Sequence, residues 1–193
     1  MRMFFTILLS LLVFVSCAEG FTAKEREVIF QGGSDVMQVM SIANRSDSLL
    51  LRSGSLPVSE EMVATDEFRT LCRRMLATVQ SPEHDGVGIA APQVGILRQM
   101  VAVQRFDKED APFEFFINPQ IKALLGEKKL GGEGCLSVPD RRGEVERFQK
   151  IVLQYRDTEF RSHLDTVEGF TAVIFQHEID HLSGVLYIDK EQK

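Results

Sequence analysis

The sequence has few cysteines and no cluster of basic residues. The first argues against a disulfide scaffold and the second against a nucleic-acid-binding protein. Three cysteines among 193 residues are too few for a disulfide scaffold. The 22 basic residues are outnumbered by 28 acidic ones, the net charge is −6, and no basic run is longer than a pair. We therefore expect no nucleic-acid partner. Repeats and low-complexity tracts are also absent, and the 44% hydrophobic content fits one globular domain with its own core.

A long hydrophobic run is missing from the chain except at its start. Residues 3–15 are apolar and follow Arg2. This stretch is shorter than the roughly 20 residues that span a bilayer, but it is typical of a signal peptide. The sequence FVSC, ending at Cys17, resembles a bacterial lipobox apart from Phe14 in place of the usual leucine. We therefore expect residues 1–17 to be a signal peptide and Cys17 to be lipidated.

Two other interpretations of this leader stay open. An ordinary signal peptide would be cut after Ala18 or Gly20, and a start at Met37 or Met40 would remove the leader and give a cytoplasmic protein. With the leader in place, we expect the protein on the periplasmic side of the cell envelope, with the lipid as its membrane attachment. Residues 18–44 are polar with weak periodicity, and we interpret them as an N-terminal extension.

Hydrophobic periodicity in the remaining sequence predicts helices early and late, with strands between them. One helix is expected to be capped by Asp66 and to place an apolar stripe, Cys72 included, against the core. A second runs from about residue 166 to residue 182 and ends before Gly184. Strands are expected at residues 99–106, 113–117 and 150–155, and short extended segments at residues 49–51 and 56–58. Gly131, Gly132 and Gly134 predict either a turn or a close approach of the backbone. This order favours an α+β fold.

The late helix carries His177 and His181, four residues apart, with Glu178 between them. Four residues turn a helix by about 400°, so both imidazoles lie on one side and can bind one metal ion. Glu178 is about 60° from His181, beside the metal position, where a general base belongs. Two histidines packed in an amphipathic helix are the alternative, which the intervening glutamate disfavours. Three apolar residues continue the same stripe and predict a water-poor wall: Phe170, Val173 and Ile174.

A catalytic metal needs a third protein ligand, which the sequence after this motif does not offer. Tyr187 stands where the longer metzincin motif has a third histidine, and only 12 residues follow His181. The upstream candidate is Cys135 in EGCLSVP, whose neighbouring glycines allow close approach of the backbone. A thiolate with two imidazoles would leave one coordination position open for catalysis. An inert buried thiol is the alternative for this cysteine.

A third stretch, GVGIAAPQVG from Gly86 to Gly95, matches the dinucleotide-binding pattern G-x-G-x-x-A superficially, with Asp107 further along. We reject that interpretation because a polar loop precedes the stretch, where the motif requires a strand. Pro92 would also interrupt the helix that must hold the pyrophosphate. The small residues instead predict a close-packed substrate wall, from which Gln93 can offer an amide N–H to a developing oxyanion.

These three stretches, GVGIAAPQ, EGCLS and HEIDH, stand in the order of the three motifs of the peptide deformylase family and resemble them. The resemblance runs from about Asp47 to Asp189, so we assign residues 45–193 to a deformylase-like catalytic domain. It implies an α+β fold with antiparallel sheets around a long C-terminal helix. It also implies a hydrolase that removes the N-formyl group from formyl-methionyl peptides and releases formate. We expect the protein to be a monomer.

The resemblance also implies a role for each matching position. Cys135, His177 and His181 would hold one divalent metal ion, Fe²⁺ or Zn²⁺. Glu178 would act as general acid and base, while Gln93 and the backbone N–H of Leu136 would bind the formyl oxyanion. Arg147 could pair with Asp180. Positions expected to bind the peptide or its methionine side chain are Gly86, Gly88, Ile89, Glu133, Gly134, Arg142, Phe170, Val173 and Ile174.

The leader and the implied activity point to different compartments. Deformylation of nascent chains belongs to the cytoplasm, whereas the signal peptide directs the protein outward. An exported deformylase could act on peptides that leave the cell with the formyl group intact, such as cleaved signal fragments. A metallopeptidase or amidase acting on another small N-acyl peptide is an alternative, and so is a peptide-binding lipoprotein without catalysis.

Overall fold

The computed structural model describes residues 20–32 and 35–192, and it has an α+β fold in which one antiparallel sheet separates the helices. The sheet order follows the chain from β1 to β5. In chain order the elements are α1 (Ala23–Phe30), α2 (Arg45–Leu51), α3 (Glu60–Val63), α4 (Asp66–Val79), β1 (Gly88–Ala90), the 3₁₀ helix η1 (Ala91–Val94), β2 (Met100–Gln104), β3 (Phe113–Cys135), β4 (Val138–Arg156), β5 (Ser162–Glu168), α5 (Gly169–Leu182) and the 3₁₀ helix η2 (Tyr187–Asp189).

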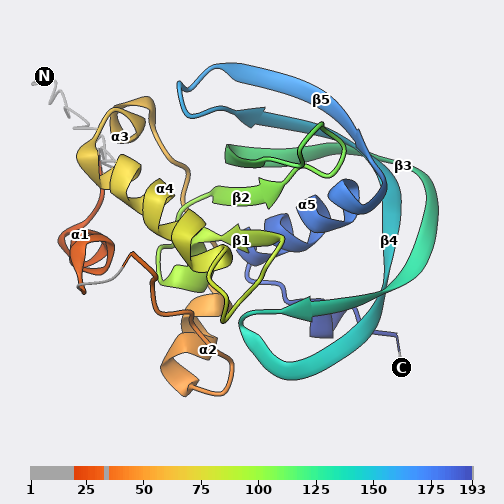
Figure 1. Ribbon diagram of the computed structural model, residues 1–193, viewed down its shortest axis with the longest axis horizontal. Helices are drawn as coiled ribbons and strands as arrows, with labels where there is room; N and C mark the ends of the chain where they lie inside the picture. Colours follow the sequence, from red (N-terminus) through yellow and green to blue (C-terminus); the bar gives the residue numbers. More distant parts are fainter. Residues whose placement is uncertain (1–19, 33–34, 193) are drawn as a thin grey trace, which may run out of the picture.

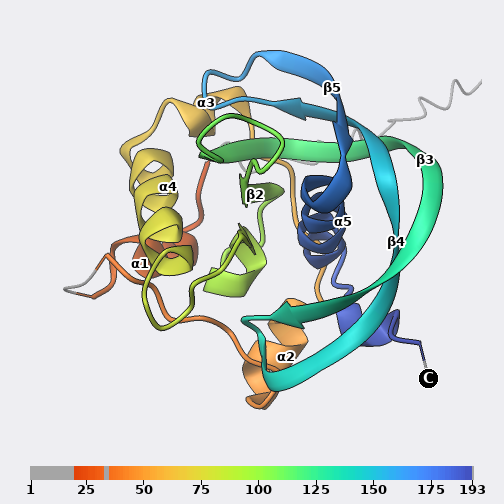
Figure 2. The ribbon, with the colours of Figure 1, turned by 45° about the vertical axis from the view of Figure 1, so that its right-hand side comes forward.

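The hairpin of β3 and β4 dominates the sheet and bends around α5 (Figures 1 and 2). Its strands are 23 and 19 residues long, and its bulges, including one between Leu125 and Lys128, allow the curvature. One core cluster fills the space between the curved sheet and α5, where Phe116 packs edge-on against Phe175 with 4.6 Å between ring centroids. The sheet thus encloses the helix that carries the HEIDH motif.

A second core cluster lies on the other side of β1 and β2, against α4. Thr65 caps α4 by accepting a hydrogen bond from the backbone N–H of Phe68, so the helix cap is one residue earlier than the expected Asp66. Cys72 packs against this cluster, and burial raises the pKa of its thiol to about 12. These observations agree with Cys72 as a core residue.

Residues 20–32 and 35–42, called the N-terminal segment from here on, contribute to the same core as α4, although the sequence is polar there. Phe21 and Ile29 are 4% and 0% exposed. The Arg98 side chain, itself 4% exposed, donates to both carboxylate oxygens of Glu25 at 2.6 and 2.9 Å and to the carbonyl of Gly20 at 3.1 Å. The boundary of the extension at residue 44 remains a prediction, but the segment is not separate from the main core.

The N-terminal segment also reaches two of the motifs through its backbone. The N–H of Met40 donates to the carbonyl of Gln93 at 2.8 Å, and the N–H of Ile42 donates to the carbonyl of Ser137 at 3.0 Å. Residues 40–42 therefore connect the GVGIAAPQ and EGCLS motifs through the backbone.

Several local expectations were wrong. The run Leu49–Leu51 lies in α2, because Asn44 caps a helix there by accepting from the N–H groups of Ser46 and Asp47. Of the two alternatives for the glycine-rich stretch 131–134, the turn is wrong, because the stretch is paired within β3. The late helix begins at Gly169, since residues 166–168 belong to β5, a strand that was not expected.

Other expectations were confirmed in outline. The strand expected at residues 99–106 contains β2, and those expected at residues 113–117 and 150–155 fall within β3 and β4, which are much longer. Gly184 follows the end of α5 with φ of +72° and closes a Schellman motif, in which the N–H of Val185 reaches the carbonyl of Asp180. Among the described helices, none has the length and apolar character to span a membrane, and the predicted signal peptide and Cys17 lie outside the described residues.

Candidate metal centre and substrate cleft

The structure brings Cys135, His177 and His181 together, although Cys135 ends β3 and the histidines lie in α5. Their ligand atoms all lie within 4.8 Å of one another, and Cys135 Sγ is 3.3 Å from His181 Nε2. Tetrahedral coordination at ordinary bond lengths separates ligand atoms by about 3.5 Å, so a small shift would close this group around a metal ion. The sequence expectation for the three ligands is thus met by their geometry.

Glu133 and Arg147 fix the orientation of one ligand. His177 Nδ1 lies 2.8 Å from Glu133 Oε2, and because a carboxylate can only accept, Nδ1 is the donor and Nε2 faces the metal position. Arg147 donates to both oxygens of Glu133 at 2.7 and 3.0 Å and to Asp180 at 2.6 Å. Glu133 had been expected to bind substrate; its carboxylate instead orients a ligand, while the residue still lines the cleft.

Two buried polar atoms at this centre have no hydrogen-bond partner among the described residues. They are Glu178 Oε2 and His181 Nδ1, on residues 4% and 1% exposed. An unpaired buried carboxylate oxygen is costly unless a ligand or water meets it. The Cys135 thiol and the two imidazole nitrogens converge on one point, and the unpaired Glu178 oxygen lies beside it. These residues therefore fit a divalent metal ion with a water molecule next to it.

The charges at the centre follow from burial and from neighbouring groups. For Glu133, burial alone would raise the pKa, but hydrogen bonds from His177 and Arg147 outweigh it and lower the pKa to about 2. Burial raises the pKa of Glu178 to about 7. Burial lowers the pKa of His181, and the charge on His177 lowers it further. Glu133 is thus a fixed anion, whereas Glu178 can exchange a proton near neutral pH.

Gly88 is required by the position of Glu178. A Cβ atom at residue 88 would lie 2.5 Å from Glu178 Oε1 and 2.9 Å from its Cδ and Cγ. The absence of a side chain in β1 therefore makes room for the glutamate of α5. This is a packing reason for the second glycine of GVGIAAPQ, in addition to its expected place along the peptide.

Gln93 is held in η1 with its amide directed at the same centre. Its Oε1 accepts from the N–H of Ala90 at 2.8 Å, which leaves the amide nitrogen to face Cys135 Sγ and Ser137 Oγ, each at 3.4 Å. The amide N–H groups can therefore reach an oxygen bound near the metal position. Ser137, fully buried beside Gln93, had not been singled out, although it belongs to the EGCLS motif.

A cavity of about 970 Å³ opens next to these groups. Its wall includes most positions expected to bind substrate, from three parts of the chain: Gly86, Gly88, Glu133, Gly134, Leu136, Arg142, Phe170, Val173 and Ile174. Ile89 is the exception, because its side chain is fully buried in the core and does not line the cavity. Any contact of Ile89 with a peptide would use its backbone.

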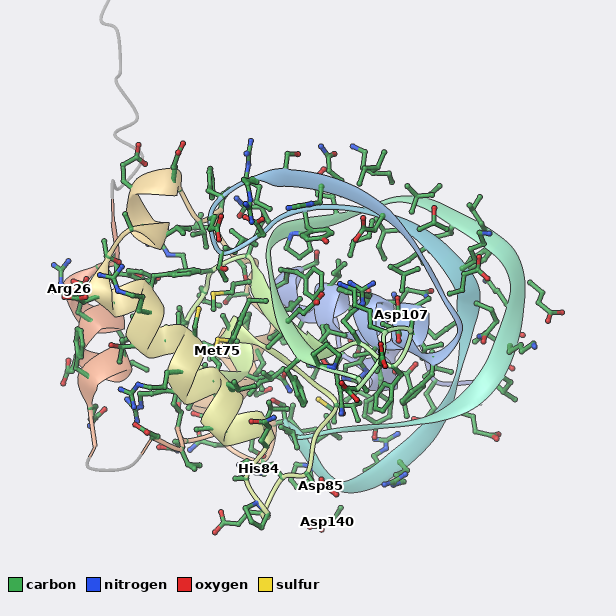
Figure 3. The ribbon with its side chains drawn as sticks, turned by 45° about the horizontal axis from the view of Figure 1, so that its top comes forward. Arg26, Met75, His84, Asp85, Asp107 and Asp140 are labelled. Carbon is green, nitrogen blue, oxygen red and sulfur yellow. The ribbon has the colours of Figure 1, made fainter. Side chains whose placement is uncertain are left out.

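Sequence reasoning did not find the outer part of the cavity. The residues concerned are 83–85, in the loop after α4, and 138–141, at the start of β4. In the view of Figure 3, His84, Asp85 and Asp140 lie along the lower edge. Loop side chains without a motif leave no signal in a single sequence.

Comparisons with known proteins agree with this site. The family model described as polypeptide deformylase matches residues 39–193. The peptide deformylase of Leptospira biflexa is 41% identical over 162 residues, covering 80% of this chain and 87% of that protein. The one from Caulobacter vibrioides is 38% identical over 155 residues, with the same two coverages.

Solved structures give the same result. A class I type b peptide deformylase from Acinetobacter baumannii superposes with a TM-score of 0.73 at 36% identity, covering 81% of this chain and 99% of that one. The enzyme from Thermotoga maritima gives 0.71 at 32% identity, with coverage of 82% and 99%. The fold, the three motifs and the Cys-His-His centre all agree: the chain belongs to the peptide deformylase family and is a metal-dependent hydrolase.

Proposed function

We propose that the protein removes the N-formyl group from peptides that begin with formyl-methionine, giving formate and a free amino terminus. The observation that carries this proposal is the buried, unpartnered Glu178 carboxylate beside Cys135, His177 and His181, at the inner end of a cavity. A relative from Acinetobacter baumannii has been solved with Met-Ala-Ser bound. That peptide is what would remain after a formyl group is removed.

The metal ion proposed for Cys135, His177 and His181 is Fe²⁺ or Zn²⁺, since a thiolate with two imidazoles suits both. When bound, such an ion supplies Lewis-acid activation of water and of the formyl oxygen. Glu178 accepts the proton of the attacking water and delivers it to the departing amine nitrogen. Its pKa near 7 suits both halves of this transfer.

The amide of Gln93 and the backbone N–H of Leu136 donate to the formyl oxygen as negative charge develops on it. The hydrogen bond from Ala90 to Gln93 fixes the amide in advance, so no reorganisation is needed during the reaction. Phe170, Val173 and Ile174 form the apolar wall that takes the methionine side chain. The formyl group carries only hydrogen on its carbon, which suits the crowded space between Gly88 and Glu178.

The proposed activity is tested with matched peptides. The metal-loaded protein should release formate from formyl-Met-Ala-Ser and leave acetyl-Met-Ala-Ser and the internal peptide bonds intact. Formate can be measured directly, and the peptides can be followed by mass spectrometry. Hydrolysis of the acetylated or internal bonds without hydrolysis of the formyl bond would favour the amidase or peptidase alternative.

We also propose that the protein is exported and anchored through Cys17. The support is the sequence of the leader: Arg2, the apolar residues 3–15 and the lipobox-like FVSC. Its substrates would then be formylated peptides outside the cytoplasm. Fractionation and lipid labelling of the wild type and Cys17→Ala test this. Recovery of both proteins in the cytosol without label would contradict it.

A further inference from the structure

Tyr187 is conspicuous in the sequence and has no role in the chemistry proposed above. It occupies the place of a third zinc-binding histidine in the longer metzincin motif, yet the structure uses Cys135 for that purpose. Tyr187 opens η2 directly after α5 and is 1% exposed. A tyrosine this deeply buried needs a partner for its hydroxyl.

The partner of the Tyr187 hydroxyl lies in the wall of the cleft. The hydroxyl donates to the backbone carbonyl of Arg141 at 3.0 Å. On its other side, the Tyr187 ring lies nearly parallel to the ring of His177, with 6.2 Å between centroids and 21° between planes. One side chain therefore contacts both a metal ligand of α5 and the backbone of β4.

The contacted part of β4 forms one edge of the substrate cavity. Residues 138–142, called the cleft edge from here on, all line the cavity, and the side chain of Arg142 lies over the backbone of Gly134. At about 970 Å³ the cavity is at the upper limit of small-molecule sites, so it has room for peptide residues beyond the methionine. The cleft edge lies where those residues would pass.

Other contacts from the chain end reach the same stretch, but at the surface. Glu191 forms an ion pair with Arg141, whose side chain is 52% exposed. The N–H of Gln192 donates to the carbonyl of Glu144 at 3.0 Å. Exposed ion pairs contribute little, whereas the Tyr187 ring belongs to a buried cluster that includes Val138. The buried hydroxyl is thus the contact best able to fix the cleft edge.

We propose that Tyr187 is a positioning residue for peptide binding: its hydroxyl sets the distance between the cleft edge and the metal-binding helix. This inference rests on the proposed deformylase function. A peptide that extends past the methionine contacts the cleft edge and depends on the hydroxyl. A substrate that ends at the methionine does not.

The test is Tyr187→Phe, which keeps the ring and removes one hydroxyl. Loss of one buried neutral hydrogen bond corresponds to about a threefold to tenfold change in an equilibrium constant. KM for formyl-Met-Ala-Ser should rise by about that factor, with kcat, metal content and KM for formyl-methionine amide unchanged. Calorimetry should show a matching loss of affinity for Met-Ala-Ser, a readout that needs no turnover.

Tyr155→Phe is the matched control, because these are the two tyrosines of the chain. The hydroxyl of Tyr155 is also hydrogen-bonded, to Asp165 at 2.8 Å, but it lies in β4 outside the cavity lining. Its loss should leave both KM values and the peptide affinity unchanged. A second variant, Glu191→Gln, removes the surface ion pair and should change KM by less than about twofold.

Three results would overturn the inference. Equal effects of Tyr187→Phe on the short and long substrates would place the hydroxyl in the chemistry. A larger effect from Glu191→Gln than from Tyr187→Phe would assign positioning to the ion pair, and loss of folding or metal in Tyr187→Phe would make the hydroxyl structural. A wild type that binds Met-Ala-Ser but deformylates neither substrate would instead contradict the proposed function.

Discussion

Helix α5 packs inside the curved sheet and the N-terminal segment packs against α4, and the two differ in how their sequences relate to their roles. In α5 the spacing of His177, Glu178 and His181 specifies the chemistry directly. The N-terminal segment has no comparable pattern, and α1 lies outside residues 39–193, which match the family model. The comparison teaches that a metal site is specified by a few spaced residues, whereas packing of a polar segment is specified by partners far away in the chain.

Buried arginines show what holds the N-terminal segment. Arg98 binds the start of α1 through Glu25 and the carbonyl of Gly20. Arg74, 6% exposed, donates to the carbonyl of Ile29 at 2.7 Å, near the end of the same helix. Both arginines lie in the part of the chain that matches the family. They hold α1, whereas the segment reaches the motifs of the metal centre through Met40 and Ile42. Variants in α1 and α5 should therefore separate activity from stability.

The largest effect is expected at the third ligand. Cys135→Ala removes the thiolate, and two imidazoles alone hold a divalent ion poorly, so metal and activity should be lost together. Metal analysis alongside a formate assay checks this. Cys72→Ala is the matched control, because that buried thiol lies in the other core and should leave metal content unchanged. Normal metal content in Cys135→Ala would show that another residue is the third ligand.

The next largest effect is expected at Gly88. A methyl group there would meet Glu178 Oε1 at 2.5 Å, so Gly88→Ala must displace the general base. Misplacing a catalytic group by about 1 Å costs about 100-fold in rate, and kcat should fall by that order while the metal stays bound. Steady-state kinetics with metal analysis tests this. An unchanged kcat would mean that Glu178 can move aside without cost.

In the N-terminal segment the expected loss is in stability. Ile29→Ala creates a cavity in the core and should lower the free energy of unfolding by about 3 kcal/mol, with kcat/KM at ambient temperature unchanged. Denaturant unfolding provides the measurement. Phe30→Ala is the control on the same helix, since Phe30 is 53% exposed and its loss should cost less than about 0.5 kcal/mol. Equal effects of the two substitutions would mean that α1 does not pack as described.

The smallest effect is expected at Glu25, and it depends on pH. Burial alone would raise the pKa of Glu25, but hydrogen bonds from Arg98 and Thr22 outweigh it, so the folded-state pKa lies below the ordinary pKa of a glutamate. A lowered pKa stabilises the fold above the unfolded-state pKa, and this contribution is lost as pH falls through the folded-state value. Glu25→Gln should therefore cost about 1 kcal/mol at neutral pH and less in acid. A difference that grows in acid would contradict this sign.

The sequence predicted the centre well because its motifs are local. His177 and His181 share a helical face, and Cys135 stands in the EGCLS motif, which resembles that of the family. It could not predict that Glu133 would orient His177, because this contact spans 44 positions and depends on the β3–β4 register. The place of the Ile89 side chain was not predicted for a related reason: it depends on which face of β1 meets the core.

Predictability was lower where tertiary contacts override local preference. The leucine run 49–51 resembled a strand, but an asparagine cap sets it in α2. The glycine-rich stretch 131–134 suggested a turn, but pairing with β4 keeps it extended. The packing of the N-terminal segment depends on Arg98, some seventy positions later, and no local pattern predicts it.

The central claim is that Glu178 moves the proton in a metal-dependent deformylation, and one variant tests it most directly. Glu178→Gln keeps the size of the side chain and removes its basicity. Deformylation of formyl-Met-Ala-Ser by this variant, measured with its metal content, should show about one bound metal per chain and turnover reduced to background. Turnover near that of the wild type, with the metal in place, would contradict the account.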